Sequence, residues 1–424
     1  MLKRTEILIR SENDSFERVI LHKAAWIVPV DRPPIKDGGV LVSGDSILEV
    51  AEYKDLKPFV TNHVEEVEHG IAAIMPGLVN AHTHLELSFM DGKIPLPQNG
   101  FAGWLDHVFS LRSSATQQDQ VIGLQLGINQ LLSGGTGLYA DICNGSDLVV
   151  KDEFPERQIF QEVLGFNLLE LESVLSTDAL EAVADNGSMV SLAAHACYSS
   201  SAELIQGAKA WCRDRNRPFS IHVAEHADEI EFIKSGTGYC RQLLERLGKW
   251  VSGWKAPGTT PVRYLDSLGV LDQETLLVHA VHMQQSDWET VSKRRSAVCF
   301  CPRSNHNLTV GRADIEKAQQ YGVLSCLGTD SLASNQDLSL FAEAEYVLHH
   351  YPNISPDTVV FMMTLGGAKA LKQGHRFGRL RRGGHSNFLA VNLPRLPSLS
   401  ELSETIIDQG NRGEWKWVSY TRNN

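Results

Sequence analysis

The stretch Pro76-Gly77-Leu78-Val79-Asn80-Ala81-His82-Thr83-His84 is an apolar run that ends in two histidines at alternate positions. Side chains two residues apart in a β-strand lie on the same face, so His82 and His84 would point into one space. Two imidazoles placed in this way can bind one metal ion. A His-x-His at a strand end is more often structural than ligating, so the hypothesis depends on further ligands elsewhere in the chain.

The composition is that of a globular protein with a small-molecule ligand. The chain has 424 residues, which favours one large α/β barrel with an appendage or two packed domains. There are 39 basic and 51 acidic side chains, and the net charge of -12 opposes attraction to a phosphate backbone. We therefore expect a small-molecule substrate and no nucleic-acid partner.

The sequence also predicts the compartment of the protein. The first residues lack the continuous apolar core of a signal peptide, and no segment is long and apolar enough to span a bilayer. The seven cysteines are scattered and include no Cys-x-x-Cys, which favours reduced thiols over a disulfide framework. We therefore expect a cytoplasmic protein with no membrane partner.

A repeating pattern of apolar strands and helix-like segments begins at Ile74. Eight such strands are the number that closes a parallel barrel. Earlier in the chain, Val40-Leu41-Val42 and Ile47-Leu48-Glu49-Val50 flank a turn and predict a hairpin, and strand character returns after Gly378. The expected barrel strands are residues 74–84, 136–143, 157–164, 191–195, 219–225, 275–279, 297–302 and 323–330.

These patterns predict an α/β protein built around a distorted (β/α)8 TIM barrel. Residues 74–377 would form the barrel, and residues 1–73 and 378–424 would form a small β-sandwich domain. The connections 85–135 and 226–274 are longer than crossover segments need, so we expect them to form lids or subunit contacts.

Polar residues stand where the apolar runs stop, and the C-terminal ends of barrel strands converge on one mouth. His222 from the fifth strand and Asp330 from the eighth would complete the ligand set begun by His82 and His84. Three imidazoles and one carboxylate suit Zn²⁺ or Fe²⁺ and leave a position for water. The metal would lower the pKa of that water.

Three further residues at strand ends have chemical roles in this hypothesis. Glu225 could face the metal water as a proton shuttle, the alternative being a solvated loop glutamate. His279 could stabilise charge at the reacting carbon, the alternative being a core histidine bonded to a backbone carbonyl. His195 lies where barrels with two metals often place a bridging lysine, which favours one metal and an imidazole that contacts the substrate.

Four motifs together resemble the amidohydrolase superfamily, and in particular its mononuclear branch of purine, pterin and triazine deaminases. They are the run from Pro76 to His84, His222-Val223-Ala224-Glu225, Val278-His279-Ala280-Val281-His282 and Gly328-Thr329-Asp330-Ser331. The resemblance implies metal ligands His82, His84, His222 and Asp330, a Glu225 proton shuttle and a His279 that orients the nucleophile. The superfamily it resembles is often dimeric, so a homodimer stays open.

Within that branch, Cys301-Pro302-Arg303-Ser304-Asn305 and the segment after Gly328 look most like aminodeoxyfutalosine deaminases of menaquinone biosynthesis. The resemblance implies hydrolytic deamination of a 6-aminopurine nucleoside-like metabolite. Methylthioadenosine or S-adenosylhomocysteine deamination, and hydrolysis of another amino or halo heteroaromatic ring, remain alternatives. The side chains expected to contact the substrate are Glu86, Ser88, Phe89, Trp104, His195, Arg303 and Asn305.

Overall fold

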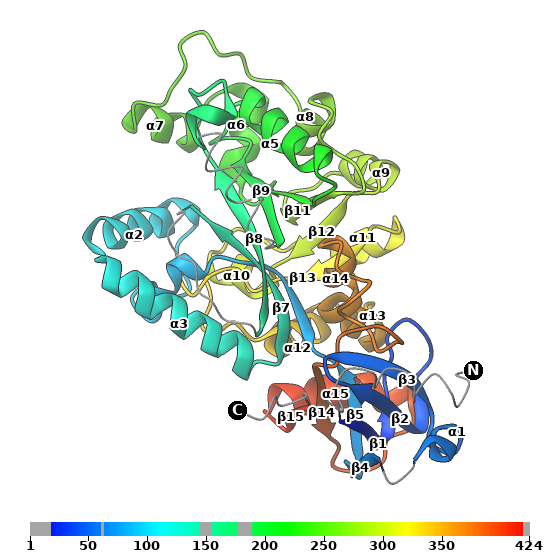
Figure 1. Ribbon diagram of the computed structural model, residues 1–424. Helices are drawn as coiled ribbons and strands as arrows, with labels where there is room; N and C mark the ends of the chain where they lie inside the picture. Colours follow the sequence, from blue (N-terminus) through cyan, green and yellow to red (C-terminus); the bar gives the residue numbers. More distant parts are fainter. Residues whose placement is uncertain (1–17, 61–62, 145–153, 176–188, 419–424) are drawn as a thin grey trace. The chain divides into compact units, whose positions relative to one another are not determined.

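Figure 1 shows the computed structural model, which describes residues 18–60, 63–144, 154–175 and 189–418. The chain forms two compact units, one of Met1–Leu78 with Gln373–Asn424 and one of Val79–Lys372. The first unit contains a mixed β-sheet and the second contains a parallel sheet surrounded by helices. Each unit is described separately below.

The first unit is built on one seven-stranded sheet with the order β15-β14-β5-β1-β2-β3, in which β4 also pairs with β1. The predicted hairpin is confirmed, because β2 and β3 pair antiparallel. The return of the C-terminal segment is also confirmed, because β14 pairs antiparallel with β5. The strands are β1 (Val19–Ile27), β2 (Ile35–Ser43), β3 (Ser46–Glu52), β4 (Val64–Glu68), β5 (Ala72–Pro76), β14 (Phe388–Asn392) and β15 (Trp415–Val418).

Apolar side chains cover both faces of this sheet. One cluster includes Ile27, Val40, Ile74 and Phe388, so it joins strands from both ends of the chain. The helices of this unit are α1 (Tyr53–Leu56), η1 (Lys57–Phe59) and α15 (Leu399–Asn411).

The second unit contains the predicted eight-stranded barrel in nearly closed form. Its strands are hydrogen-bonded in the order of the sequence, from β6 to β13. A parallel bridge between Thr83 and Asp330 brings the two ends of the sheet together, and the Asp330 amide donates to the His82 carbonyl at 3.1 Å. The strands are β6 (Leu78–Thr83), β7 (Thr136–Cys143), β8 (Glu156–Val163), β9 (Met189–Ala196), β10 (Phe219–Val223), β11 (Thr275–His279), β12 (Ala297–Phe300) and β13 (Ser325–Leu327).

The prediction of one continuous strand over residues 74–84 is wrong. The run divides at Gly77 into β5, which belongs to the first sheet, and β6, which belongs to the barrel. A Cβ on Gly77 would lie 3.1 Å from the Trp417 ring, so the backbone passes this point close to an aromatic side chain. A continuous apolar run carries no signal for such a division, because both strands are fully buried.

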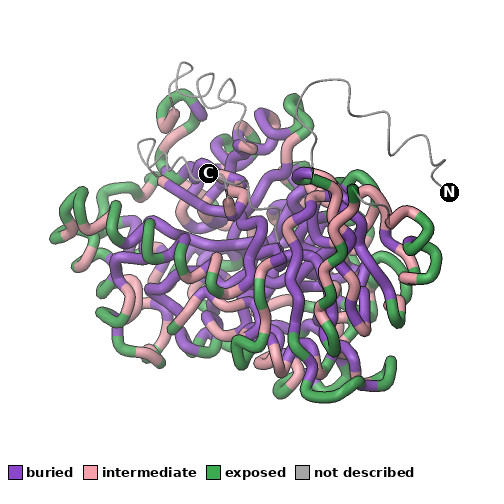
Figure 2. Tube along the Cα trace, turned by 60° about the horizontal axis from the view of Figure 1, so that its bottom comes forward, coloured by how far each residue is buried: buried purple, intermediate pink, exposed green. Residues whose placement is uncertain are grey.

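Helices surround the barrel strands in Figure 1, and Figure 2 shows buried residues mainly in the interior and exposed residues mainly at the periphery. The first long connection contains η2 (Leu85–Met90), α2 (Phe101–Ser114) and α3 (Gln117–Ser133). The second contains α6 (Ala227–Ser235), α7 (Tyr239–Arg246) and α8 (Pro261–Ser267). The remaining helices are η3 (Leu171–Ser173), α5 (Ala202–Asp214), α9 (Gln285–Arg294), α10 (Pro302–Asn307), α11 (Ile315–Gln320), α12 (Leu340–His350), α13 (Pro356–Phe361), the π-helix η4 (Met362–Gly366) and α14 (Gly367–Ala370).

The seven cysteines are all buried as free thiols, as the sequence predicts. Among the described residues, no helix has the length and the apolar character needed to cross a membrane.

Candidate metal and active site

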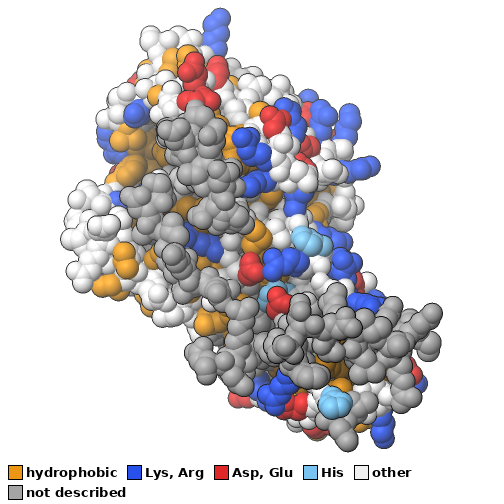
Figure 3. Space-filling view, viewed as in Figure 1, with side chains coloured by type: hydrophobic (Ala, Val, Ile, Leu, Met, Phe, Trp, Pro, Cys, Tyr) orange, Lys and Arg blue, Asp and Glu red, His pale blue; other side chains and the backbone are white. Residues whose placement is uncertain are grey.

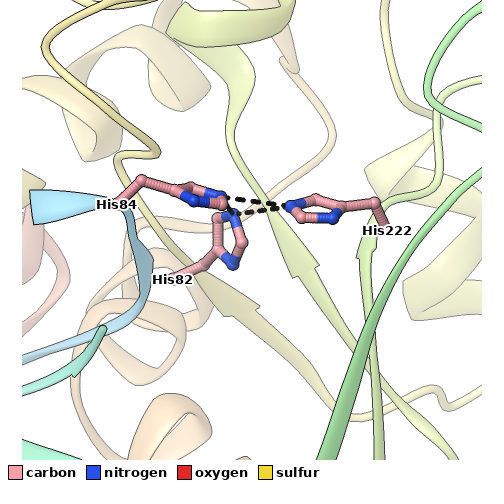
Figure 4. A group of neighbouring side chains, drawn as sticks. All are labelled: His82, His84 and His222. Atoms are coloured by element: carbon pink, nitrogen blue, oxygen red, sulfur yellow. Dashed lines mark hydrogen bonds between the residues drawn. The ribbon is translucent and has the colours of Figure 1, made fainter. Parts of the chain in front are cut away.

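Three histidines converge at one end of the barrel. His82 lies on β6, His84 follows the end of that strand, and His222 lies on β10. Their Nε2 atoms form a triangle with sides of 3.2, 3.2 and 3.3 Å, as Figure 4 shows. All three side chains are buried. Neutral imidazoles whose ring nitrogens meet in this way are suited to share one cation.

The triangle fits a divalent metal. Tetrahedral Zn²⁺ binds imidazole nitrogen at about 2.1 Å, which separates two nitrogens by about 3.4 Å, close to the spacing observed here. The Nδ1 atom of His222 lies 2.7 Å from the His195 carbonyl oxygen, which can only accept, so Nδ1 carries the proton. The His222 Nε2 lone pair is therefore directed at the other two rings.

Asp330 supplies an oxygen beside this triangle. Its Oδ1 atom lies 3.8 Å from Nε2 of His82 and 3.8 Å from Nε2 of His84. Its Oδ2 atom accepts hydrogen bonds from the hydroxyls of Ser304 at 2.7 Å and Ser334 at 2.8 Å. The two serines satisfy one carboxylate oxygen, so the other remains directed at the histidines. Together these four side chains offer three nitrogens and one oxygen.

Burial favours the uncharged form of His82 and His222. Burial and the neighbouring His84 lower the pKa of His82 well below its usual value. Burial, followed by His195, lowers the pKa of His222 in the same direction. Because a metal competes with protons for the ring nitrogens, neutral imidazoles are ready to bind it near pH 7.

Glu225 and His279 lie next to this cluster and face each other. Glu225 follows β10 after Ala224, whose φ of 51° is in the left-handed region. The Glu225 Oε1 atom lies 3.5 Å from Nε2 of His279, and the His279 Nδ1 donates to Asn305 Oδ1 at 2.9 Å. Burial and the nearby Asp330 raise the pKa of Glu225 well above its usual value. A carboxyl group with a raised pKa is suited to donate a proton, so Glu225 can act as a general acid.

The structure places the predicted substrate residues in several different settings. Glu86 accepts hydrogen bonds from the Asn144 backbone and side-chain nitrogens, both at 2.9 Å, and pairs with Arg112. The Ser88 hydroxyl is buried without a partner, and Phe89 lies in an apolar cluster with Val108.

The other predicted substrate residues make defined contacts. The Trp104 indole donates to the Ala333 carbonyl at 2.8 Å, and His195 Nδ1 lies 2.5 Å from the Ser199 hydroxyl. Arg303 forms a two-pronged ion pair with Asp337, at 2.7 and 2.8 Å. In this structure the Arg303 guanidinium, which was expected to bind a substrate carboxylate, is paired with Asp337. The Asn305 side chain accepts the hydrogen bond that orients His279.

Sequence reasoning missed several supporting residues. Asp141, near the end of β7, accepts from the Leu85 amide at 3.0 Å and from Arg157 Nη2 at 2.6 Å, so it fixes the backbone next to His84. Glu229 accepts from the Glu225 amide at 3.1 Å. Contacts with other elements identify the role of Asp141, although its position at the end of β7 was a usable signal, whereas the contact between Glu225 and Glu229 is local.

Glu162 was also missed. It lies near the end of β8, and its Oε1 atom is buried without a hydrogen bond, 3.9 Å from Nδ1 of His222. Burial raises the pKa of Glu162 to about 7. With His195 and His222 it forms a second group of potential ligand atoms on the other side of the His222 ring.

Comparison with protein families identifies the fold and its chemistry. The model of the amidohydrolase family matches residues 73–414, which include all the residues of the histidine cluster. The chain belongs to the amidohydrolase family. This amidohydrolase is therefore a hydrolytic enzyme, and the predicted family and the barrel are both confirmed.

Two curated relatives are similar to this amidohydrolase over most of their length. An aminodeoxyfutalosine deaminase of Deinococcus radiodurans is 30% identical over 82% of this chain and 84% of its own. A 5-methylthioadenosine/S-adenosylhomocysteine deaminase of Carboxydothermus hydrogenoformans is 26% identical over 89% of this chain and 85% of its own.

A solved structure supports the architecture of this amidohydrolase. Aminofutalosine deaminase of Helicobacter pylori, in complex with methylthio-coformycin, superposes with a TM-score of 0.80 and 21% identity, over 91% of this chain and 95% of the other. At this identity the similarity establishes the fold.

Proposed function

We propose that this amidohydrolase is a metal-dependent deaminase that hydrolyses the 6-amino group of a purine nucleoside-like metabolite, with aminodeoxyfutalosine as its substrate. The observation that carries the proposal is the position of Glu225, a buried acid 3.5 Å from His279, next to three convergent imidazoles. Both curated relatives described above are named as deaminases, which supports this class of reaction.

The proposed metal ligands are His82, His84, His222 and Asp330, and their donor set suits Zn²⁺ or Fe²⁺. When bound, such an ion supplies a nucleophile near neutral pH because it lowers the pKa of water.

The protein's own groups then handle the protons of the reaction. Glu225 donates a proton to the ring nitrogen beside the carbon that bears the amino group, which makes that carbon more electrophilic. His279, oriented by Asn305, stabilises the charge that develops as water adds. One proton of the attacking water reaches the departing nitrogen through Asp330 and Glu225, and the other restores the proton that Glu225 gave to the ring. One water is consumed, and one ammonia and one oxo-purine are released.

The proposed substrate pocket is formed by residues around η2 and the neighbouring strand ends. Glu86, held by Arg112 and Asn144, offers carboxylate oxygens to the sugar hydroxyls. Ser88, Phe89, Trp104 and His195 complete the proposed contacts with the nucleoside. Arg303 contributes to recognition of a remote carboxylate only if its ion pair with Asp337 opens.

Two alternative functions share the same chemistry. The relative from Carboxydothermus hydrogenoformans supports methylthioadenosine or S-adenosylhomocysteine as the substrate. Hydrolysis of a pterin or triazine amino or halo group would use the same metal site and the same acid.

A substrate panel distinguishes these possibilities. Ammonia release would be measured with aminodeoxyfutalosine, methylthioadenosine, S-adenosylhomocysteine and 5′-deoxyadenosine, together with halide release from a chlorotriazine. The proposal predicts the highest kcat/KM with aminodeoxyfutalosine. A higher value with methylthioadenosine would transfer the assignment to that substrate, and halide release without ammonia would reject deamination.

A further inference from the structure

Glu162 is a buried carboxylate that the proposed mechanism does not use. Charged side chains usually lie on the surface, and Figure 3 shows acidic and basic groups interspersed on the face that it draws. Glu162, by contrast, is only 4% exposed, and its Oε1 atom has no hydrogen-bond partner among the described residues. A buried carboxylate oxygen is unfavourable unless a donor bonds to it, so Glu162 points to a ligand.

Glu162 lies at the mouth of the barrel, beside the candidate site. It is the next-to-last residue of β8, and the ends of the parallel barrel strands converge on this mouth. A carboxylate oxygen of Glu162 and ring nitrogens of His195 and His222 lie within 4.8 Å of one another. Burial raises the pKa of Glu162 to about 7, and the neighbours that also act on this pKa are His84, Glu86, Asn144 and Arg112. The carboxylate therefore faces the polar groups that hold Glu86.

His195 presents a hydrogen-bond donor to the same space. Its Nδ1 atom lies 2.5 Å from the Ser199 hydroxyl, which also lies 3.3 Å from the Ala196 carbonyl oxygen. That carbonyl already accepts from the backbone amides of Ser199 and Ser200, at 3.2 and 3.1 Å. The hydroxyl proton is therefore directed at Nδ1. Burial lowers the pKa of His195 to about 4, so the ring is neutral near pH 7 and its single proton lies on Nε2.

We propose that Glu162 and His195 bind one hydroxyl of the substrate's sugar, and that Glu162 makes the enzyme selective for nucleosides that carry this hydroxyl. A hydroxyl can donate to the Glu162 carboxylate and accept from the His195 Nε2 atom. Two hydrogen bonds of about 2.8 Å that meet at a tetrahedral angle place their outer atoms about 4.6 Å apart, which agrees with the spacing of the two side chains. This inference rests on the proposed function, because it assumes a nucleoside in the site.

The neighbouring Glu86 favours a sugar diol as the ligand. The Glu86 carboxylate already accepts hydrogen bonds from Asn144 and Arg112, which limits its capacity for two hydroxyls. Glu162 supplies a second carboxylate beside it, so each carboxylate can accept from one of two adjacent hydroxyls. An amino group or a cation would pair with Glu162 but would leave the His195 donor without an acceptor.

Nucleosides that lack one hydroxyl test the assignment. The zinc-loaded protein would be compared on 5′-deoxyadenosine, 2′,5′-dideoxyadenosine and 3′,5′-dideoxyadenosine. Ammonia release gives kcat/KM, and calorimetry in a Glu225→Gln background gives Kd without turnover. A hydrogen bond to a charged group is equivalent to about 10- to 100-fold in affinity, so loss of the assigned hydroxyl should weaken binding by that factor.

The decisive variant is Glu162→Leu. It should bind 5′-deoxyadenosine more weakly by the same factor, and it should no longer distinguish this nucleoside from one of the two dideoxynucleosides. The other hydroxyl, assigned to Glu86, should still be distinguished. A merely structural role of Glu162 would instead weaken the binding of all three nucleosides equally.

Two further variants complete the comparison. Glu162→Gln keeps the shape of the side chain and an acceptor oxygen, so it covers the case in which Glu162→Leu does not fold, and it should show intermediate discrimination. Asp272→Asn is the matched control. Asp272 precedes β11, at the end of the strand opposite the site, and accepts from Lys209 at 2.5 Å. Its replacement should leave the ratios between the nucleosides unchanged.

Binding and turnover separate this inference from the proposed function. Selective binding without ammonia release would contradict the proposed function and would leave the assignment of Glu162 in place. Ammonia release with the same discrimination in the parent protein and in both Glu162 variants would overturn the assignment and leave the function in place. A parent protein that binds none of the three nucleosides, or that binds them equally, would also overturn the assignment.

Discussion

The Oε1 atom of Glu225 lies 3.5 Å from the Nε2 atom of His279. Glu225 follows the end of β10, and His279 is the last residue of β11. The Glu225 backbone amide donates a hydrogen bond to the Glu229 carboxylate, and the His279 Nδ1 atom donates one to Asn305. The pair therefore stands in a fixed position next to the three histidines, and its chemistry can be tested one residue at a time.

Replacing Glu225 by Gln should remove the acid and leave the shape of the site unchanged. General acid–base catalysis contributes about 10²- to 10⁴-fold, so we expect kcat to fall by that factor. Metal content, measured by mass spectrometry on the same sample, should stay that of the parent protein. A Glu225→Gln variant with full turnover would exclude the assigned role.

Removal of the metal should abolish turnover reversibly. Because the Nε2 atoms of the three histidines converge beside the Asp330 Oδ1 atom, the metal-free protein keeps uncompensated lone pairs there, and it should melt at a lower temperature. Chelation followed by titration with Zn²⁺ or Fe²⁺ should restore activity at about one ion per chain. Restoration that needs two ions would point to a second site, for which Glu162 and His195 are the available side chains.

Ser304 and Ser334 should act as positioning residues for Asp330. Loss of either hydroxyl removes one of the two hydrogen bonds that the Asp330 Oδ2 atom accepts, and such second partners usually contribute 10- to 100-fold in metal affinity. Competition with a chromophoric chelator should therefore show weaker binding in Ser304→Ala and Ser334→Ala. Ser267→Ala, at an exposed hydroxyl on α8, is the control. Unchanged affinity in both site variants would show that the carboxylate needs no such support.

Removal of one partner of the Asp141–Arg157 ion pair should destabilise the protein strongly. Both side chains are nearly inaccessible, and removal of one partner leaves a buried charge, at a cost of about 3–5 kcal/mol. Urea denaturation of Asp141→Ala should show this loss, whereas Asp141→Leu combined with Arg157→Met should recover much of it. A double variant as unstable as the single one would mean that the hydrogen bond to Leu85, and not the charge, dominates.

Stability should fall as pH rises because of Glu343. Burial raises the pKa of Glu343 from 4.5 to about 8, so the folded state holds a proton that the unfolded state releases. The stabilisation that comes from this bound proton is fully present below about pH 4.5 and is lost progressively up to about pH 8. Thermal melting of Glu343→Gln should show a smaller decrease over this window than the parent protein. An equal decrease of the melting temperature with pH in the two proteins would refute the raised pKa of Glu343.

Much of the barrel could be predicted because apolar runs and polar strand ends are local features. Thr136–Cys143 and Thr275–His279 are strands with the predicted bounds. The division at Gly77 could not be predicted, because the residues on both sides of it are apolar and buried although they belong to different sheets.

In the candidate site, too, the residues at strand ends could be predicted and their partners could not. His82, His84, His222 and Asp330 end strands that a parallel barrel must bring together, and the structure places them within a few ångströms of one another. The partners of these groups come from side-chain packing between elements, which no spacing in the sequence encodes. The pairing of Arg303 with Asp337 is an example, because no motif in the sequence relates these two residues.

The most direct test of the central claim is ammonia release from aminodeoxyfutalosine by the metal-loaded protein, with metal content determined on the same sample. The account predicts one ammonia for each oxo-purine formed, at about one metal per chain, and no release after chelation. Turnover that persists without metal, or a metal-loaded protein that releases no ammonia from this or any other 6-aminopurine nucleoside, would contradict it.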